Sequence, residues 1–200
     1  MRLRVIVTVV VLALAASLSG CVIQRPDSSR DWDRGRSEMP MMPMMSMNLS
    51  EPTWLAEMIP HHEEAVRAAE ELARSSRPEM RDLGAAIVSS QTAQIAQMRA
   101  WLDRWYPDEP EVTAYRPMMR DLSGLEGDAL DRAFLDDMIG HHMMAVMMSQ
   151  HLLSGRSTTH DEVADLARQI SAEQRAEIRQ MSSWLRAWFG QRAPGMMWGR

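Results

Sequence analysis

The chain has 200 residues and a formal net charge of −5, which suits one domain with accessory segments. This mildly acidic balance argues against nucleic acid as a partner, because binding to nucleic acid depends on Lys and Arg side chains that neutralise phosphates. A single cysteine excludes a disulfide framework and a thiolate metal site within the fold. The compositional outlier is methionine, with 20 residues.

Residues 1–20 have the pattern of a secretory leader. Two arginines precede an apolar run over residues 5–18, which is short for a membrane span of about 20 apolar residues. Leu18-Ser19-Gly20-Cys21 then resembles the lipobox of bacterial lipoproteins. We therefore expect a lipoprotein signal peptide at 1–20 and a lipid on Cys21 that anchors the mature chain to a membrane outside the cytoplasm, facing the periplasm or at the cell surface. An uncleaved anchor and an ordinary signal peptide are the alternatives.

Residues 21–49 are rich in Pro, Ser, Arg and Asp and poor in aliphatic side chains, which predicts a flexible tether. Six methionines crowd into residues 39–47, where no regular core would need them. Because exposed thioethers are prone to oxidation, capture of metal ions is one interpretation of this cluster. Residues 191–200 form a second Met-containing segment, a short tail.

From residue 50 onward the pattern is helical, because apolar residues recur at steps of three and four. The pattern returns at an offset of 80 and then 83 residues, so units 54–107 and 134–190 form an internal repeat. No part of the chain reads as a strand. The sequence therefore predicts an all-α fold, a four-helix bundle over 50–190 made of two repeated helical hairpins and joined by a link at roughly 107–122.

The helix ends also carry signals. Ser76-Arg77-Pro78-Glu79 has the form of a capping box, and Thr159-His160-Asp161-Glu162 repeats it at the start of the last helix. Gly155 is a candidate stop for the third helix.

Two equivalent motifs concentrate four of the six histidines. Met58-Ile59-Pro60-His61-His62 returns as Met138-Ile139-Gly140-His141-His142, and each copy is followed by an Ala-Val pair. Adjacent residues on a helix lie about 100° apart, so one histidine of each pair falls on the apolar stripe and the other at its edge. Imidazole with methionine sulfur is the donor set of a soft-to-borderline metal site. We expect as ligands His61, His62, His141 and His142, with Met58 and Met138 as soft partners.

Further polar and sulfur-containing side chains extend the candidate site. Gln91 and Gln174 occupy core positions of the partner helices, where a buried amide needs a hydrogen-bond partner such as an imidazole N–H. Additional candidate ligands are Met98, Met181, Met144, Met148 and His151. Methionine at helical spacing is more often core filler than ligand, and a histidine on an apolar stripe is usually a satisfied core residue.

The donor set also bears on the metal. Thioether plus imidazole favours Cu(I), with Cu(II) held mainly by the histidines, and silver competes by the same argument. Zinc accounts for the histidines but not for the methionines.

Both units resemble the bacterial domain-of-unknown-function family 305, through the Met-Ile-Pro/Gly-His-His-x-x-Ala-Val motif and the later Gln, Ile, Met and Trp-Leu positions. The resemblance covers nearly all of residues 54–190. It implies a ferritin-like helical bundle and, from the methionine-rich periplasmic members, copper binding and resistance. The first unit departs from the second where Glu63 and Glu64 replace Met143 and Met144. The resemblance therefore does not imply that the two units bind the same metal equally.

These observations predict an extracytoplasmic, lipid-anchored protein that binds copper for sequestration, buffering or resistance, with a donor or acceptor protein and homo-oligomerisation left open. A ferritin-like oxidase is one alternative, but di-iron bundles need E-x-x-H motifs. Here Glu57 and Asp137 precede His61 and His141 by four residues instead, so we expect no enzyme. The other alternative is a metal-free helical scaffold of the cell envelope.

Overall fold

The structure, a computed structural model, describes residues 49–108, 115–155 and 158–191. The predicted leader, Cys21, the methionine cluster at 39–47 and the tail from 192 onward lie outside these residues. Within the described ranges no helix combines the length and the hydropathy needed to cross a bilayer.

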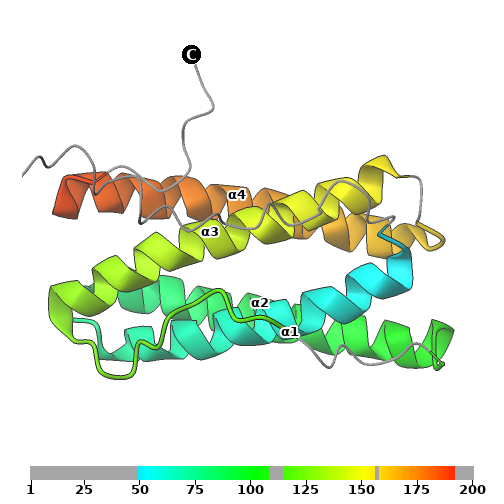
Figure 1. The fold of residues 1–200 in the computed structure, drawn as a ribbon, viewed down its shortest axis with the longest axis horizontal. Coiled ribbons are helices and arrows are strands. Elements are labelled where there is room, and N and C mark those ends of the chain that lie inside the picture. Colours follow the sequence, from blue (N-terminus) through cyan, green and yellow to red (C-terminus); the bar gives the residue numbers. More distant parts are fainter. Residues whose placement is uncertain (1–48, 109–114, 156–157, 192–200) are drawn as a thin grey trace, which may run out of the picture. The chain divides into compact units, whose positions relative to one another are not determined.

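Four helices carry the fold. They are α1 (Glu51–Glu70), extended by the 3-10 helix η1 (Glu71–Arg74), α2 (Pro78–Trp105), α3 (Gly127–Ser154) and α4 (Asp161–Phe189). Helix α1 packs along α2, and α3 packs along α4, while the two hairpins meet mainly through α1 and α3 (Figure 1). The predicted class, an all-α bundle made of two repeated hairpins, is confirmed.

The predicted capping boxes are wrong. Arg77 is the N-cap of α2 and His160 the N-cap of α4, and neither side chain caps its own helix. Residues that precede a proline favour extended backbone, which suits Arg77 before Pro78. Both N-cap side chains instead bind a carboxylate of the other hairpin. Gly155 does follow the last residue of α3, as expected.

The first of these contacts, which we call the Asp131 clamp, joins α3 to the start of α2 and to the end of α4. Arg77 Nη1 donates to Asp131 Oδ2 at 2.6 Å, and Asp131 is fully buried. The same guanidinium lies over the rings of Trp188 and Phe189 near the end of α4, 4.9 Å and 5.4 Å from their centroids. One cation thereby holds three helices from both hairpins.

The Glu51 clamp occupies the equivalent positions of the repeat. The buried carboxylate of Glu51 accepts from His160 Nδ1 at 2.6 Å and from the Tyr106 hydroxyl at 2.9 Å. Backbone N–H groups of Thr159 and His160 donate to it as well. The His160 ring stacks on Trp105 with centroids 3.7 Å apart. Arg77 and His160 therefore have equivalent roles in the two halves, because each binds a buried carboxylate of the other hairpin.

Two apolar clusters fill the core, and each draws on both hairpins. One contains Phe134, Met138 and Met181, together with the later part of α1 and the start of α2. The other contains Trp54 and Met58, together with the end of α2, the later part of α3 and the start of α4. In every helix a polar stretch separates the residues of the two clusters. We call this level the polar layer; its members are His61, His62, Gln91, Gln94, His141, His142, Gln174 and Glu177.

Two glycines test how closely the helices pack. A Cβ atom at Gly84 in α2 would lie 2.7 Å from the carbonyl oxygen of Ala69 and 2.9 Å from Leu72 Cβ, whereas one at Gly140 in α3 would meet nothing within 4 Å.

We expect Gly84→Ala to lower the free energy of unfolding by about 1–3 kcal/mol through overpacking. Gly140→Ala should raise it by up to about 1 kcal/mol, because alanine is the better helix former. Urea unfolding followed by circular dichroism measures both; a stabilised Gly84→Ala variant would contradict this packing.

Candidate metal centre

The structure brings the four motif histidines together inside the bundle. Their exposed fractions are 2% for His61 and 0% for His62, His141 and His142. They form a row of rings in which the centroids of His62 and His61 are 6.0 Å apart, those of His61 and His141 3.7 Å, and those of His141 and His142 6.2 Å. Two motifs 80 residues apart thus meet where α1 contacts α3. Helical periodicity places His61 and His141 at the edge of the apolar stripe. In the structure the opposite hairpin covers that edge, so both side chains are buried.

The outer histidines are oriented by the partner helices. His62 Nε2 donates to Gln94 Oε1 at 3.0 Å, and Gln94 Nε2 donates onward to Glu173 at 2.9 Å. Because that second bond fixes the amide, the Gln94 oxygen must face His62. At the equivalent position of α4, Glu177 Oε2 accepts from His142 Nε2 at 2.6 Å.

These partners differ from the predicted pair, Gln91 and Gln174. Both glutamines are buried, but Gln91 Oε1 and the two polar atoms of the Gln174 amide have no hydrogen-bond partner. Gln94 and Glu177, one turn later in each helix, contact the imidazoles instead. Helical side chains lean toward the N-terminus of their helix, so the residue one turn further on reaches back to the histidine.

The inner histidines lie against each other and against Glu64. His61 Nε2 donates to the backbone oxygen of His141 at 3.2 Å. His141 Nε2 lies 3.3 Å from Glu64 Oε2, within ion-pair distance but without the alignment of a hydrogen bond. The first motif therefore faces uncharged acceptors, whereas both histidines of the second motif face carboxylates.

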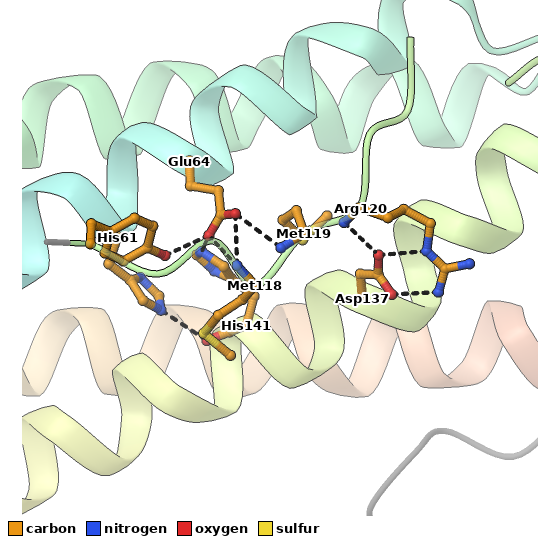
Figure 2. Close-up of polar contacts among 8 residues, drawn as sticks. His61, Glu64, Met118, Met119, Arg120, Asp137 and His141 are labelled. Carbon is orange, nitrogen blue, oxygen red and sulfur yellow. Dashed lines mark hydrogen bonds and ion pairs between the residues drawn. The ribbon is translucent and has the colours of Figure 1, made fainter. Parts of the chain in front are cut away.

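Glu64 is fastened to the link between the hairpins by what we call the strap, residues 115–119. Its carboxylate accepts from the backbone N–H groups of Met118 at 2.8 Å and Met119 at 2.9 Å, and from the Tyr115 hydroxyl. Figure 2 shows the strap running past Glu64, with Met118 beside His141. Sequence reasoning missed this contact, although the replacement of Met144 by Glu64 between the repeats was a signal for it.

The charge state of the layer follows from burial. Burial lowers the pKa of His62 to about 3, and burial followed by the neighbouring imidazoles lowers the pKa of His61. The pKa of His141 is also lowered by burial, although Glu64 acts against it. Burial acts to raise the pKa of Glu64, but the nearby His141 ring, the Tyr115 hydroxyl and the Met119 backbone N–H lower it to about 2. Near pH 7 these imidazoles are neutral and stand beside a carboxylate.

The nitrogen atoms left unpartnered are the chemically important ones. In all four histidines Nδ1 is buried and has no hydrogen-bond partner. Because Nε2 of His61, His62 and His142 acts as a donor, a neutral ring carries its lone pair on Nδ1, the form that binds metals. A buried polar atom without a partner costs about 1–3 kcal/mol. A cation held by these nitrogens would remove that cost.

Sulfur atoms flank the layer on both sides. Met58 and Met98 belong to one apolar cluster and Met138 and Met181 to the other, all fully buried and each about one turn from a layer residue. The remaining candidates lie further along α3, where Met144 and Met148 are half-buried and His151 is exposed.

The donor set is therefore a soft one. Within the described ranges, no three His, Cys, Asp or Glu side chains gather into a metal-holding group. Imidazole nitrogens supplemented by thioether sulfur are what the layer offers, and this combination fits Cu(I) or Ag(I).

Known proteins share this architecture. The family model described as Domain of unknown function (DUF305) matches residues 51–185 and, separately, 131–199. CopM in its Cu(I)-bound form is 31% identical with a TM-score of 0.64, covering 70% of this chain and 99% of CopM. CopM in an Ag-bound form is 32% identical with a TM-score of 0.62, covering 70% and 98%. A candidate secreted DUF305 protein from Streptomyces coelicolor is 28% identical with a TM-score of 0.62, covering 72% and 96%. No curated protein sequence matches the chain.

The neutral histidines make the metal-free protein sensitive to acid. An unfolded imidazole protonates near its ordinary pKa of 6.5, whereas folded His62 stays neutral down to a pKa of about 3. The unfolded chain therefore binds more protons below pH 6.5, and the stability that is complete above that pH is lost as the pH falls toward 5. The slope for each such histidine increases as the unfolded imidazole becomes protonated and approaches about 1.4 kcal/mol per pH unit near pH 5.

Chemical unfolding between pH 7 and pH 5, with a chelator present, measures that slope. The His62→Gln variant should lose one histidine's share of it, and His151→Gln, at an exposed site on α3, should not. Identical slopes for His62→Gln and the unmodified chain would contradict the assignment.

Proposed function

The chain belongs to the DUF305 family, and from this we propose that it is an extracytoplasmic metal-binding protein that holds copper in the polar layer. The observation that carries the proposal is the set of four buried Nδ1 atoms without hydrogen-bond partners, in rings of which three have Nε2 already engaged as a donor. CopM, which has been solved in Cu(I)-, Cu(II)- and Ag-bound forms, supports it through similarity over nearly its whole length.

We propose that the imidazoles and sulfurs divide the ligand roles. His61, His62, His141 and His142 bind through Nδ1, with Met58 and Met138 as soft partners and Met98 and Met181 as reserve sulfurs. Gln94 and Glu177 hold the outer rings in the binding tautomer. Cu(I) is favoured, silver competes, and zinc would use the histidines alone.

The biological role we propose is sequestration or buffering of copper at the cell envelope. The leader pattern and Cys21 support export and lipid anchoring, with the protein facing the periplasm or the cell surface. The methionine tether would capture ions and raise their local concentration near the bundle, since a linked second site acts at high effective concentration.

Catalysis and a purely structural role are the competing functions. The described helices place Glu57 and Asp137 four residues before a histidine, so the i, i+3 carboxylate–histidine pairs of di-iron bundles are not formed at these motifs. A metal-free scaffold would show no change in melting temperature on addition of copper, whereas a binding protein must be stabilised by its ligand. An oxidase would consume a reductant in the presence of oxygen.

The ligand assignment is tested by anaerobic Cu(I) titration of residues 22–200 against a competing chelator. We expect the variant with all four motif histidines changed to Ala to lose tight binding, while its helical circular dichroism persists. Gln94→Ala should weaken binding by about 10- to 100-fold, because the imidazole it orients is released. His151→Ala is the matched control and should bind as the unmodified chain does. Undiminished binding in the four-histidine variant would move the site to the methionine tether.

Membrane attachment is tested with the full chain expressed in a bacterial host. The unmodified protein should incorporate labelled fatty acid and sediment with membranes. Cys21→Ser should abolish labelling, because the sulfur that carries the lipid is lost. Labelling that persists in Cys21→Ser would exclude this anchor.

A further inference from the structure

An open groove of about 630 Å³ leads from the surface to the polar layer. His141 lines it, together with Gly140 on the preceding position of α3 and Met118 of the strap. The side chain of His141 is itself fully buried. The groove therefore places His141, whose Nδ1 has no hydrogen-bond partner, beside a space that solvent can enter.

Gly140 keeps this approach wide. A Cβ atom at this position would meet no other atom within 4 Å, so the glycine is not required by close packing of the helices. Its backbone conformation is helical and makes no demand for glycine either. What the missing side chain does provide is room directly beside His141.

Met118 is held at this groove by its own backbone. It is one of two large apolar side chains that stand exposed in the described part of the chain, with 39% of its surface accessible. A lone exposed methionine is ordinary on a protein surface. Here, however, the backbone N–H of Met118 donates to both oxygens of Glu64, at 2.8 Å and 3.1 Å, which fixes the residue beside His141 (Figure 2).

The charges along the groove favour a cation. Arg120 is paired with Asp137 through two side-chain hydrogen bonds of 2.7 Å and 2.6 Å, which cancels both charges. Asp136 also lines the groove; its ion-pair partner Arg132 is 3.9 Å away and does not line the groove, and the ionised Glu64 lies behind His141. A channel lined by excess negative charge raises the local concentration of positive ions.

We propose that this groove is the route by which a soft monovalent cation, Cu(I) or Ag(I), reaches the polar layer, and that the Met118 thioether is its first ligand. This inference rests on the function proposed above. The ion exchanges the thioether for an imidazole nitrogen of His141, with no change in oxidation state. Thioethers bind soft ions well and Cu(II) and Zn(II) weakly. The route therefore favours soft ions through a faster rate of entry, before the histidines discriminate by binding affinity.

Two variants separate the route from the final site. Met118→Leu keeps the apolar volume and removes the sulfur, and Gly140→Leu fills the space beside His141. The matched control is Met147→Leu, which changes the other exposed methionine, 47% accessible on α3. All are made in residues 22–200, and circular dichroism establishes that each variant is folded.

The measurement is the rate and extent of anaerobic Cu(I) transfer from a coloured chelator, recorded by stopped-flow absorbance, with Cu(II) binding as the second probe. We expect Met118→Leu to slow Cu(I) uptake about tenfold, with equilibrium affinity changed less than about threefold and Cu(II) uptake unchanged. Gly140→Leu should slow the uptake of both ions, and Met147→Leu should slow neither.

Wild-type rates in both variants, with binding intact, would overturn the route and leave the proposed function standing. Equal losses of rate and affinity in Met118→Leu would also overturn it, since Met118 would then be a permanent ligand. Absence of Cu(I) binding by the unmodified chain would overturn the proposed function and the route with it.

Discussion

Burial of four imidazoles at one level of the bundle is the constraint on which the rest of the structure depends. Protonated rings would repel each other and lose their hydration there, so burial keeps His61, His62 and His141 in the neutral form near pH 7. Nε2 of His62, His142 and His61 is engaged by Gln94, Glu177 and a backbone carbonyl, respectively, whereas Nδ1 of every ring is left without a hydrogen-bond partner. Two apolar clusters above and below the layer supply the burial that compensates for these unmet groups.

The sequence pattern was sufficient for the features that depend on helical periodicity. Steps of three and four, repeated at a fixed offset, predicted the four helices and the hairpin repeat, and the duplicated motif singled out His61 and His141. Those two rings then lie 3.7 Å apart in the structure. What periodicity does not resolve is which of two polar residues on the same helical face meets a partner. Gln91 and Gln94 are one turn apart, and only packing against α1 decides between them.

Long-range polar contacts were beyond the reach of local signals. Ser76 has the right spacing for a capping box, yet Arg77 takes the N-cap position because its guanidinium binds Asp131 on α3. Likewise, a glutamate such as Glu64 would be assigned to the solvated surface from the sequence, whereas in the structure the strap covers it and donates two backbone hydrogen bonds to it. The strap also makes the two halves unequal. Carboxylates lie beside His141 and His142, whereas the first motif faces uncharged acceptors, so the second motif is better suited to a more highly charged ion.

Because each apolar cluster takes side chains from both hairpins, neither hairpin encloses a core of its own. A chain with a single unit would have to pair with a second copy of itself, and the contact between His61 and His141 would then lie on the twofold axis. In such a homodimer every substitution occurs twice. Joining the two units in one polypeptide removes that restriction: a glutamate at position 64 can coexist with the methionine retained at 144. Duplication within one gene thus lets a symmetric metal site evolve a distinct front and back.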